Sequence, residues 1–326
     1  MKLDLEQIRS ITKGAADVRE EDGYFRFFRF TSTQSLSYKN DGLGDFHMKT
    51  YATSGVRFAF VTDAKNITFD YRTSIGSSRY YGYFDVYVND IMAFHFGQPD
   101  ASVPESKAEI ALDGNKNKVE IYFPWSRRTE IKNFELDGSF EPVSRSRKMI
   151  CYGDSITQGY DAIYPSLAYD AILARLLDCD QINKGIAADV FYPKIIEKEC
   201  ASPDIVTVAY GTNDWSKTSK EKFEKNCTEF YKKVRETFPE SVIFGITPIW
   251  RKDYSDKKAI GFTADELDSR MRSLCSGIKD IYFINGWLLT PHIPDFYSDK
   301  YLHPNDLGFS VYARNLYEKI KESGKV

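Results

Sequence analysis

Two different hydrophobic patterns divide the chain near residue 145. Between about residues 20 and 140, short segments rich in aromatic and β-branched residues largely alternate apolar and polar positions, as at 24–27, 56–61, 67–71, 83–88 and 119–123. A period of two is typical of strands with one buried face, and turn signals such as 40-NDG-42 and 113-DGN-115 punctuate this part. We therefore predict an all-β sandwich here.

The pattern changes after residue 148. Apolar runs near 148–153, 180–185, 204–210, 241–247 and 280–285 alternate with amphipathic segments near 165–177, 189–199, 219–237, 264–277 and 305–322. Strand alternating with helix predicts a parallel sheet with helices on both faces. The predicted domains are a β-sandwich at 1–145 and an α/β domain at 146–326, which suits a length of 326 residues.

Composition and charge argue against nucleic acid and membranes as partners. A net charge of −3 and the lack of a long basic run argue against nucleic-acid binding, and the short basic cluster at 145–148 fits a solvated joint. No stretch of about 18 apolar residues predicts a membrane span, and the polar start does not resemble a signal peptide. We expect a cytoplasmic protein that does not bind membranes.

The cysteines argue against a metal site. Five are present, an odd number, and none has CxxC or CxxH spacing. Buried free thiols in a reducing compartment are the expected state, and no metal or other cofactor is predicted.

Chemically useful residues follow the predicted strands. In open parallel sheets, ligands bind beyond the carboxyl ends of the strands. At those positions the chain places a hydroxyl, a glycine and a carboxamide, and the loop before the last helix adds an imidazole with nearby carboxylates: these are Ser155, Gly185, Asn213 and His303. Together they favour an acyl-transfer site.

Each residue type has a role in that chemistry. A serine needs a base to remove its proton, an imidazole can act as that base, and a carboxylate can orient the imidazole. Backbone amides and an Asn side chain can stabilise the oxyanion. Taken singly, each has a structural alternative: Ser155 or Asp154 could cap a helix, Gly185 could serve a turn, and Asn213 with Asp214 could form an ordinary loop.

Four segments also carry a family resemblance. In order, GDSITQG, NKG, GTND and HPND resemble the signature blocks of the SGNH hydrolases, or GDSL-type esterases and lipases, over about residues 148–322. The resemblance implies a flavodoxin-like three-layer α/β/α fold. The chain also resembles two-domain carbohydrate esterases in which a jelly-roll-like β-sandwich precedes the SGNH domain.

Carried over by position, the resemblance makes Ser155 the nucleophile and His303 the general base. The amides of Ser155 and Gly185, with the Asn213 side chain, would form the oxyanion hole. Ser155 is followed by Ile156-Thr157, so the second glycine of a GxSxG elbow is missing, which favours this family over the α/β-hydrolases.

The triad acid departs from the family pattern. The acid usually stands three residues before the histidine, where this chain has Lys300, whereas Asp299 stands four before. We predict Asp299 as the acid. The alternatives are a Ser-His dyad oriented by a backbone carbonyl, or a carboxylate from Asp295 or Asp306.

Other candidates have a simpler interpretation. Asp154 is expected to bond across the turn that holds Ser155. His292 competes with His303 for the role of base but lacks the HPN context, and His47 and His95 are expected to be surface or core residues of the β half.

The expected substrate is a small acyl ester, acetyl above all, of a carbohydrate or related metabolite. No apolar lid segment is visible, and Trp250 and Tyr160 are predicted to contact substrate, although Trp250 could serve only packing. The cluster 78-SRYYG-82 is the best candidate for contact between the β half and the site. Alternatives are a lipase, lysophospholipase or thioesterase, or a non-catalytic carbohydrate-binding protein; the oligomeric state stays open.

Overall fold

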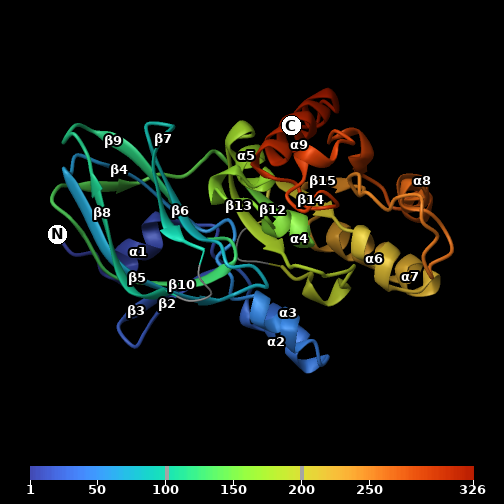
Figure 1. Ribbon diagram of the computed structural model, residues 1–326, viewed down its shortest axis with the longest axis horizontal. Coiled ribbons are helices and arrows are strands. Elements are labelled where there is room, and N and C mark those ends of the chain that lie inside the picture. The colour runs from blue at the N-terminus through green and yellow to red at the C-terminus, as the bar shows by residue number, and fades with distance from the viewer. Residues whose placement is uncertain (100–102, 199–201) are drawn as a thin grey trace.

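The computed structural model describes residues 1–99, 103–198 and 202–326. Two antiparallel sheets form the N-terminal half, and a parallel sheet with helices forms the C-terminal half (Figure 1). The predicted fold class, an α/β domain preceded by an all-β domain, is confirmed. The boundary between residues 145 and 146 stays a prediction; the first parallel strand, β12, begins at Arg147.

The all-β part is held by a core of phenylalanine and branched aliphatic side chains. Alternate residues of β5, Ile67, Phe69 and Tyr71, point into this core, as the period of two predicts. The Phe69 ring stacks on Phe134 at 5.6 Å. One sheet contains β1 (Thr12–Lys13), β4 (Arg57–Thr62), β9 (Asn117–Tyr122), β6 (Gly82–Val88), β7 (Ile91–Gln98) and β11 (Phe140–Pro142); the other contains β2 (Asp17–Glu21), β3 (Tyr24–Phe28), β10 (Arg127–Leu136), β5 (Asn66–Ile75) and β8 (Val103–Ala111).

The described residues of the β half also form three helices: α1 (Leu5–Ile11), α2 (Ser32–Asn40) and α3 (Gly44–Lys49). The expected turn at 40-NDG-42 is the connection between α2 and α3. A capping box starts α2, in which Thr31 and Gln34 exchange side-chain and backbone hydrogen bonds. Tyr38 and Phe30 then pack into the core of the C-terminal half.

The parallel sheet has the order β13-β12-β14-β15-β16, which is the flavodoxin-like order 2-1-3-4-5. Gly153 at the end of β12 lies opposite Gly185 of β13 and Ala209 of β14. The carboxyl ends of the three strands therefore share one edge. The strands are β12 (Arg147–Gly153), β13 (Cys179–Gly185), β14 (Ile205–Ala209), β15 (Val242–Ile246) and β16 (Ile281–Ile284).

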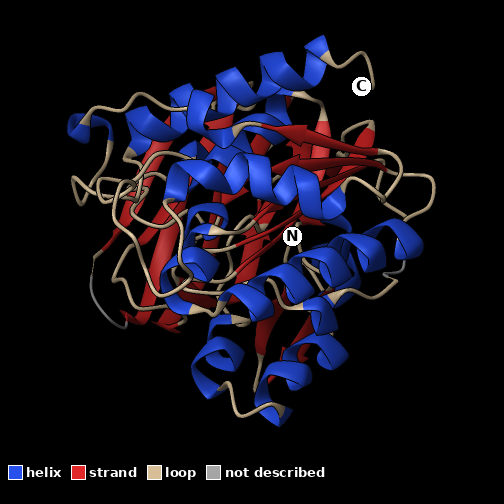
Figure 2. Cartoon of the chain, turned by 90° about the vertical axis from the view of Figure 1, so that its right-hand side faces the viewer, coloured by secondary structure: helices blue, strands red, loops and turns tan. Residues whose placement is uncertain are grey.

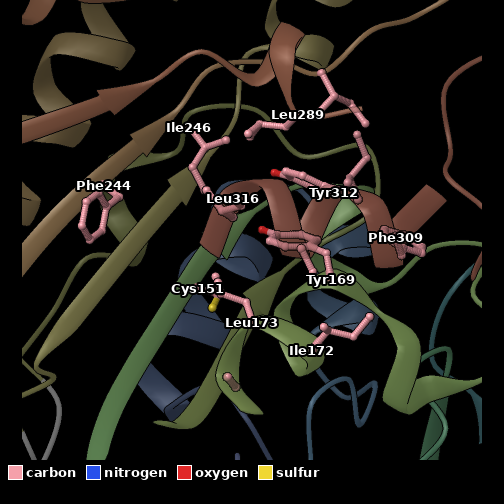
Figure 3. Close-up of a cluster of buried hydrophobic side chains, with 14 of the residues drawn as sticks. Cys151, Tyr169, Ile172, Leu173, Phe244, Ile246, Leu289, Phe309, Tyr312 and Leu316 are labelled. Atoms are coloured by element: carbon pink, nitrogen blue, oxygen red, sulfur yellow. The ribbon is translucent and has the colours of Figure 1, made fainter. Parts of the chain in front are cut away.

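Helices cover both faces of this sheet (Figure 2). On one face, the rings of Tyr169 of α5 and Tyr312 of α9 are in tilted contact and pack over Cys151 of β12 (Figure 3). The other face carries Ile150 and Tyr152 against α7 and α8. The helices are α4 (Ser155–Gln158), α5 (Tyr169–Leu176), α6 (Thr212–Lys217), α7 (Lys220–Thr237), α8 (Leu267–Cys275) and α9 (Asp306–Glu322).

One predicted helix is wrong. The segment near 189–199 forms only a 3-10 turn at Pro193–Ile195, and residue 199 lies outside the described residues. Pro193 lacks an N–H and cannot continue a helix that begins before it. The residues of this segment bond instead to side chains of other elements, since the Phe191 N–H donates to Asp214.

A buried arginine joins the two halves. Arg29, which is fully buried, follows β3 and donates to the carbonyls of Asn183 and Gly185 at the end of β13, each at 2.8 Å. It also donates to the carbonyls of Ala52 and Lys49 on its own side. Charge-assisted bonds thus tie the β half to the edge of the sheet where the candidate site lies.

Two sequence expectations concern thiols and membranes. Four cysteines, Cys151, Cys179, Cys227 and Cys275, are buried and free, as expected, while Cys200 lies outside the described residues. Among the helices of residues 1–99, 103–198 and 202–326, none is long and apolar enough to span a bilayer.

Candidate active site

Ser155 stands at the turn from β12 into α4. Asp154 is the N-cap of this short helix, and its Oδ1 accepts the N–H of Ile156 at 2.9 Å. The helix ends at Gly159, whose φ of 91° requires little more than a hydrogen for a side chain. Asp154 therefore holds the turn, as predicted, and the hydroxyl of Ser155 is left for another partner. Burial raises the pKa of Asp154 to about 6.

That partner is His303. The Oγ of Ser155 lies 3.0 Å from Nε2 of His303, and Nδ1 of the same ring lies 2.7 Å from Oδ2 of Asp299. Ser155 is only 4% exposed, so the hydroxyl lies in a largely desolvated position. The three side chains form a continuous hydrogen-bonded chain with the geometry expected of nucleophile, base and acid.

The loop before α9 explains how an acid four residues before the histidine reaches it. Oδ1 of Asp299 accepts the N–H groups of Tyr301, Leu302 and His303, at 2.8 to 3.1 Å. Lys300 adopts a left-handed conformation with φ 55°, which absorbs the extra residue. Burial opposes ionisation, but the hydrogen bonds from His303 and the loop backbone hold the pKa of Asp299 well below its usual range.

The alternative acids and the alternative base lie in other contacts. Asp295 pairs with Lys300 at 2.8 Å, and Oδ1 of Asp306 accepts the N–H of Ile163 at 3.0 Å. His292 is exposed, and its Nε2 lies 2.8 Å from the carbonyl of Trp287. The β-half histidines are also engaged locally: His47 with Ser35 and His95 with Asp85.

The three predicted oxyanion donors differ in whether their N–H groups already donate a hydrogen bond within the protein. The N–H of Ser155 has no acceptor among the described residues. The Nδ2 of Asn213 donates one hydrogen bond, to the carbonyl of Asp189 at 3.0 Å, and has a second proton. The N–H of Gly185, however, donates to Oδ1 of Asn183 at 2.8 Å, so this conformation leaves Gly185 without a free amide.

A neighbouring residue supplies an amide that the sequence did not suggest. Ala188, three positions after Gly185, has φ 72°, an uncommon conformation for a residue with a side chain. Its N–H has no acceptor within the described parts of the chain, and the next residue, Asp189, accepts the bond from Asn213. Ala188 is recognised as a candidate oxyanion donor only from the conformation of the tight turn after β13.

Gly185 nonetheless has a strict steric requirement. A Cβ at this position would lie 2.3 Å from the backbone nitrogen of Gln158. The glycine therefore allows β13 to approach α4 closely, and this approach keeps the loop after β13 beside the Ser155 turn.

The two predicted substrate contacts are buried. Trp250 is 6% exposed and packs on Tyr297, with ring centroids 4.9 Å apart. Tyr160 is 5% exposed, and its ring lies 4.8 Å from that of His303. Both rings belong to the same hydrophobic cluster, but Tyr160 lies beside the candidate base.

A second carboxylate adjoins the histidine. Oδ2 of Asp161 lies 3.9 Å from Nδ1 of His303. Within the described residues, Asp161, Asp299 and His303 are the group whose ligand atoms could hold a metal ion, all within 4.8 Å of one another. Both carboxylates already have cationic or imidazole partners, Arg79 for Asp161 and His303 for Asp299.

The comparison with known families concerns the C-terminal half. Residues 151–311 match the GDSL-like lipase/acylhydrolase family. The match includes Ser155, Asn213, Asp299 and His303. No curated protein sequence matches the chain.

Solved structures share the arrangement of both halves. A salicylyl-acyltransferase, SsfX3, from a tetracycline biosynthetic pathway superimposes with a TM-score of 0.79 at 20% identity, covering 96% of this chain and 94% of that chain. A putative GDSL-like lipase from Bacteroides ovatus gives 0.70 at 18%, covering 96% and 95%. A family two carbohydrate esterase from Clostridium thermocellum, in complex with cellohexaose, gives 0.66 at 18%, covering 84% and 94%. At these identities the likeness concerns the fold.

Proposed function

Residues 151–311 belong to the GDSL-like lipase/acylhydrolase family, whose members are carboxylic ester hydrolases, and from this premise we propose that Ser155, His303 and Asp299 form a catalytic triad. The observation that carries the proposal is the chain of contacts from the Ser155 hydroxyl through the His303 ring to Asp299, at 3.0 and 2.7 Å. The enzyme would remove a small acyl group, acetyl above all, from a carbohydrate or related metabolite.

The geometry supports a two-step acyl transfer. Oγ of Ser155 attacks the ester carbonyl carbon while its proton passes to Nε2 of His303, and Asp299 stabilises the resulting imidazolium. The tetrahedral intermediate then collapses, the ester C–O bond breaks, and the departing alcohol takes the proton from His303. Water, activated by the same imidazole, hydrolyses the acyl-serine and releases the acid.

We propose that three donors stabilise the oxyanion: the amides of Ser155 and Ala188 and the side chain of Asn213. Ala188 takes the place that the sequence assigned to Gly185, because the Gly185 amide is already bonded to Asn183. Removing one such donor costs roughly 3 to 4 kcal/mol of transition-state stabilisation in enzymes of this kind.

The acyl group is proposed to be small because the loops of the sequence contain no strongly apolar lid segment. The cavity of about 10 Å³ behind the Ser155 turn is lined by Asp154, Ile156, Tyr210 and Thr212 but not by Ser155 or His303, so it does not define the acyl chain length. Tyr160 is the better of the two predicted aromatic contacts, since its ring lies beside His303, whereas the Trp250 ring packs on Tyr297.

An ester screen tests the function. p-Nitrophenyl esters from acetate to decanoate are assayed with the wild type and Ser155→Ala in parallel, followed by acetylated sugars and acetylated non-sugar alcohols. We expect loss of rate beyond about four carbons, preference for the sugars, and no turnover by Ser155→Ala. Fastest hydrolysis of decanoate would favour a lipase, and ligand binding without turnover would favour a carbohydrate-binding protein.

A further inference from the structure

A loop of the β half reaches the candidate triad. Ser78 hydrogen-bonds the hydroxyl of Tyr160, and Nε of Arg79 bonds Oδ1 of Asp161 at 2.7 Å. The guanidinium of Arg79 also lies 4.5 Å from the centre of the Tyr160 ring. Residues Ser78 and Arg79 thus touch both residues that flank His303.

The loop is itself anchored to its own sheet. Arg127 donates to the carbonyl of Tyr80 at 2.7 Å, and Ser126 donates to the carbonyl of Tyr81 at 2.5 Å. These contacts fix the backbone immediately after Arg79, so Arg79 reaches Asp161 from a held position.

The buried carboxylate of Asp161 needs a cationic partner to remain charged. Its carboxylate is 5% exposed and has one oxygen on Arg79 and the other 3.9 Å from Nδ1 of His303. That second distance is too long for a hydrogen bond, whereas Oδ2 of Asp299 lies within hydrogen-bond distance of Nδ1, at 2.7 Å. Asp161 therefore acts on the imidazole by charge and by shape, not by hydrogen bonding.

We propose that Asp161, paired with Arg79 of the β half, is a positioning residue for His303, and that Arg79 balances the second carboxylate beside the catalytic imidazole. This inference deepens the proposed function and rests on the roles assigned to Ser155 and His303. The two carboxylates beside Nδ1 of His303 thus differ: Asp161 is paired with Arg79, whereas Asp299 is paired with the imidazole itself. The β half thus sets the electrostatics of the base directly.

The prediction depends on all groups that face the His303 ring. Among the described residues these are Ser155 and Asp154 from the turn after β12, Tyr160 and Asp161 from the loop after α4, and Asp299 from its own loop. Removing Arg79 leaves the negative charge of Asp161 unopposed and stabilises the imidazolium. Removing the charge of Asp161 leaves that of Arg79 unopposed and destabilises it.

The test follows the titration of the His303 ring by NMR, without substrate, in the otherwise wild-type full chain. The ring signal is assigned by its absence in His303→Gln. We expect Arg79→Gln to raise the pH midpoint by roughly half to one pH unit and Asp161→Asn to lower it by a similar amount. The double variant should return close to the wild type.

Several controls separate charge from structure. Arg79→Lys keeps the charge and should keep the wild-type midpoint, and Arg272→Gln breaks a comparable exposed pair with Asp268 on α8 and should change nothing. Asn tolerates the left-handed φ of 72° at position 161, so Asp161→Asn preserves the backbone. If Asp161→Asn fails to fold, the comparison of Arg79→Gln with Arg79→Lys decides, because the midpoint should rise in the first variant and stay at the wild-type value in the second.

Two results would overturn the inference: midpoints of both single variants within about 0.2 pH units of the wild type, or shifts in the same direction. The titration needs no turnover. An absence of esterase activity would therefore contradict the proposed function, whereas the effect of Arg79 and Asp161 on the His303 ring would still be decided by the titration.

Discussion

The hydroxyl of Ser155 lies 3.0 Å from Nε2 of His303, although 148 positions separate the two residues along the chain. Because only the neutral ring can accept the serine proton, the rate of ester hydrolysis should rise with pH as the imidazolium loses its proton, and then level off. The measurement is kcat/KM for p-nitrophenyl acetate from pH 5 to 8. A flat profile, with chemistry limiting, would count against this pair.

Asp299→Asn should lower kcat by about 10⁴-fold, because an amide can hold the imidazole in the wrong tautomer. The loop should survive, since the Asn oxygen can still accept the backbone N–H groups that Oδ1 accepts now. Asp295→Asn, on the same loop but paired with Lys300, is the matched control and should keep its rate. Equal rates for both variants would indicate a Ser-His dyad.

Asn213→Ala should lower kcat by about 10² to 10³-fold with a smaller change in KM, because its side-chain donor acts on the charge that develops in the transition state.

Ala188→Gly should retain activity, since its backbone amide is unchanged. It should also raise the free energy of unfolding, because glycine adopts a left-handed φ without the strain of a side chain. An inactive Ala188→Gly variant with a normal melting temperature would argue against Ala188 in the oxyanion hole.

Asp189→Asn should flatten the dependence of stability on pH. Burial raises the pKa of Asp189 to about 7, and its Oδ2 accepts a hydrogen bond from Tyr38 at 2.7 Å. Between about pH 4 and pH 7 the folded protein keeps a proton that the unfolded chain has lost. This contribution is complete below about pH 4 and is lost as the pH rises towards 7.

The measurement for Asp189 is the free energy of unfolding in urea at pH 5 and pH 7. The asparagine cannot titrate, so the fall in stability over this interval should be smaller by up to about 1.4 kcal/mol per pH unit. Asp295→Asn removes an exposed carboxylate and should leave the slope unchanged. An unaltered slope in Asp189→Asn would show that this carboxyl is ionised at both pH values.

Arg29→Met should destabilise the chain by roughly 3 to 5 kcal/mol, because it leaves the buried carbonyls of Asn183 and Gly185 without this donor. Urea unfolding measures the loss. Arg19→Met is the control: Arg19 is partly exposed and pairs with Asp17, and its loss should cost less than about 1 kcal/mol. Similar costs for both would mean that the halves are joined mainly by other contacts.

Local pattern predicted most of the fold. The five strands of the parallel sheet begin and end close to the predicted runs, because a strand buried on both faces is a short, nearly continuous apolar segment. Helix α2 escaped prediction, since its sequence Ser32–Asn40 is mostly polar and carries little hydrophobic periodicity. Its signal was the capping box of Thr31 and Gln34, which is a pattern of two residues only.

Parts of the candidate site could not be read from the sequence. Ser155, Asn213 and His303 stand beside recognisable elements, whereas the choice between the amides of Gly185 and Ala188 depends on how one loop folds back on Asn183. The sequence pointed to the cluster 78-SRYYG-82 as the contact from the β half, but not to its partner: the pairing of Arg79 with Asp161 joins segments 82 positions apart. Such contacts arise only from the packing of one half on the other.

The Arg29 contacts also have a consequence for synthesis on the ribosome. Arg29 is made 154 residues before Asn183, the first of its two acceptors in β13. At roughly 5 to 20 residues per second, this interval is about 8 to 30 seconds. During this interval the N-terminal sheets of the nascent chain can fold, but the guanidinium of Arg29 must stay hydrated or bind other acceptors. The junction between the halves is thus completed only after β13 has left the exit tunnel.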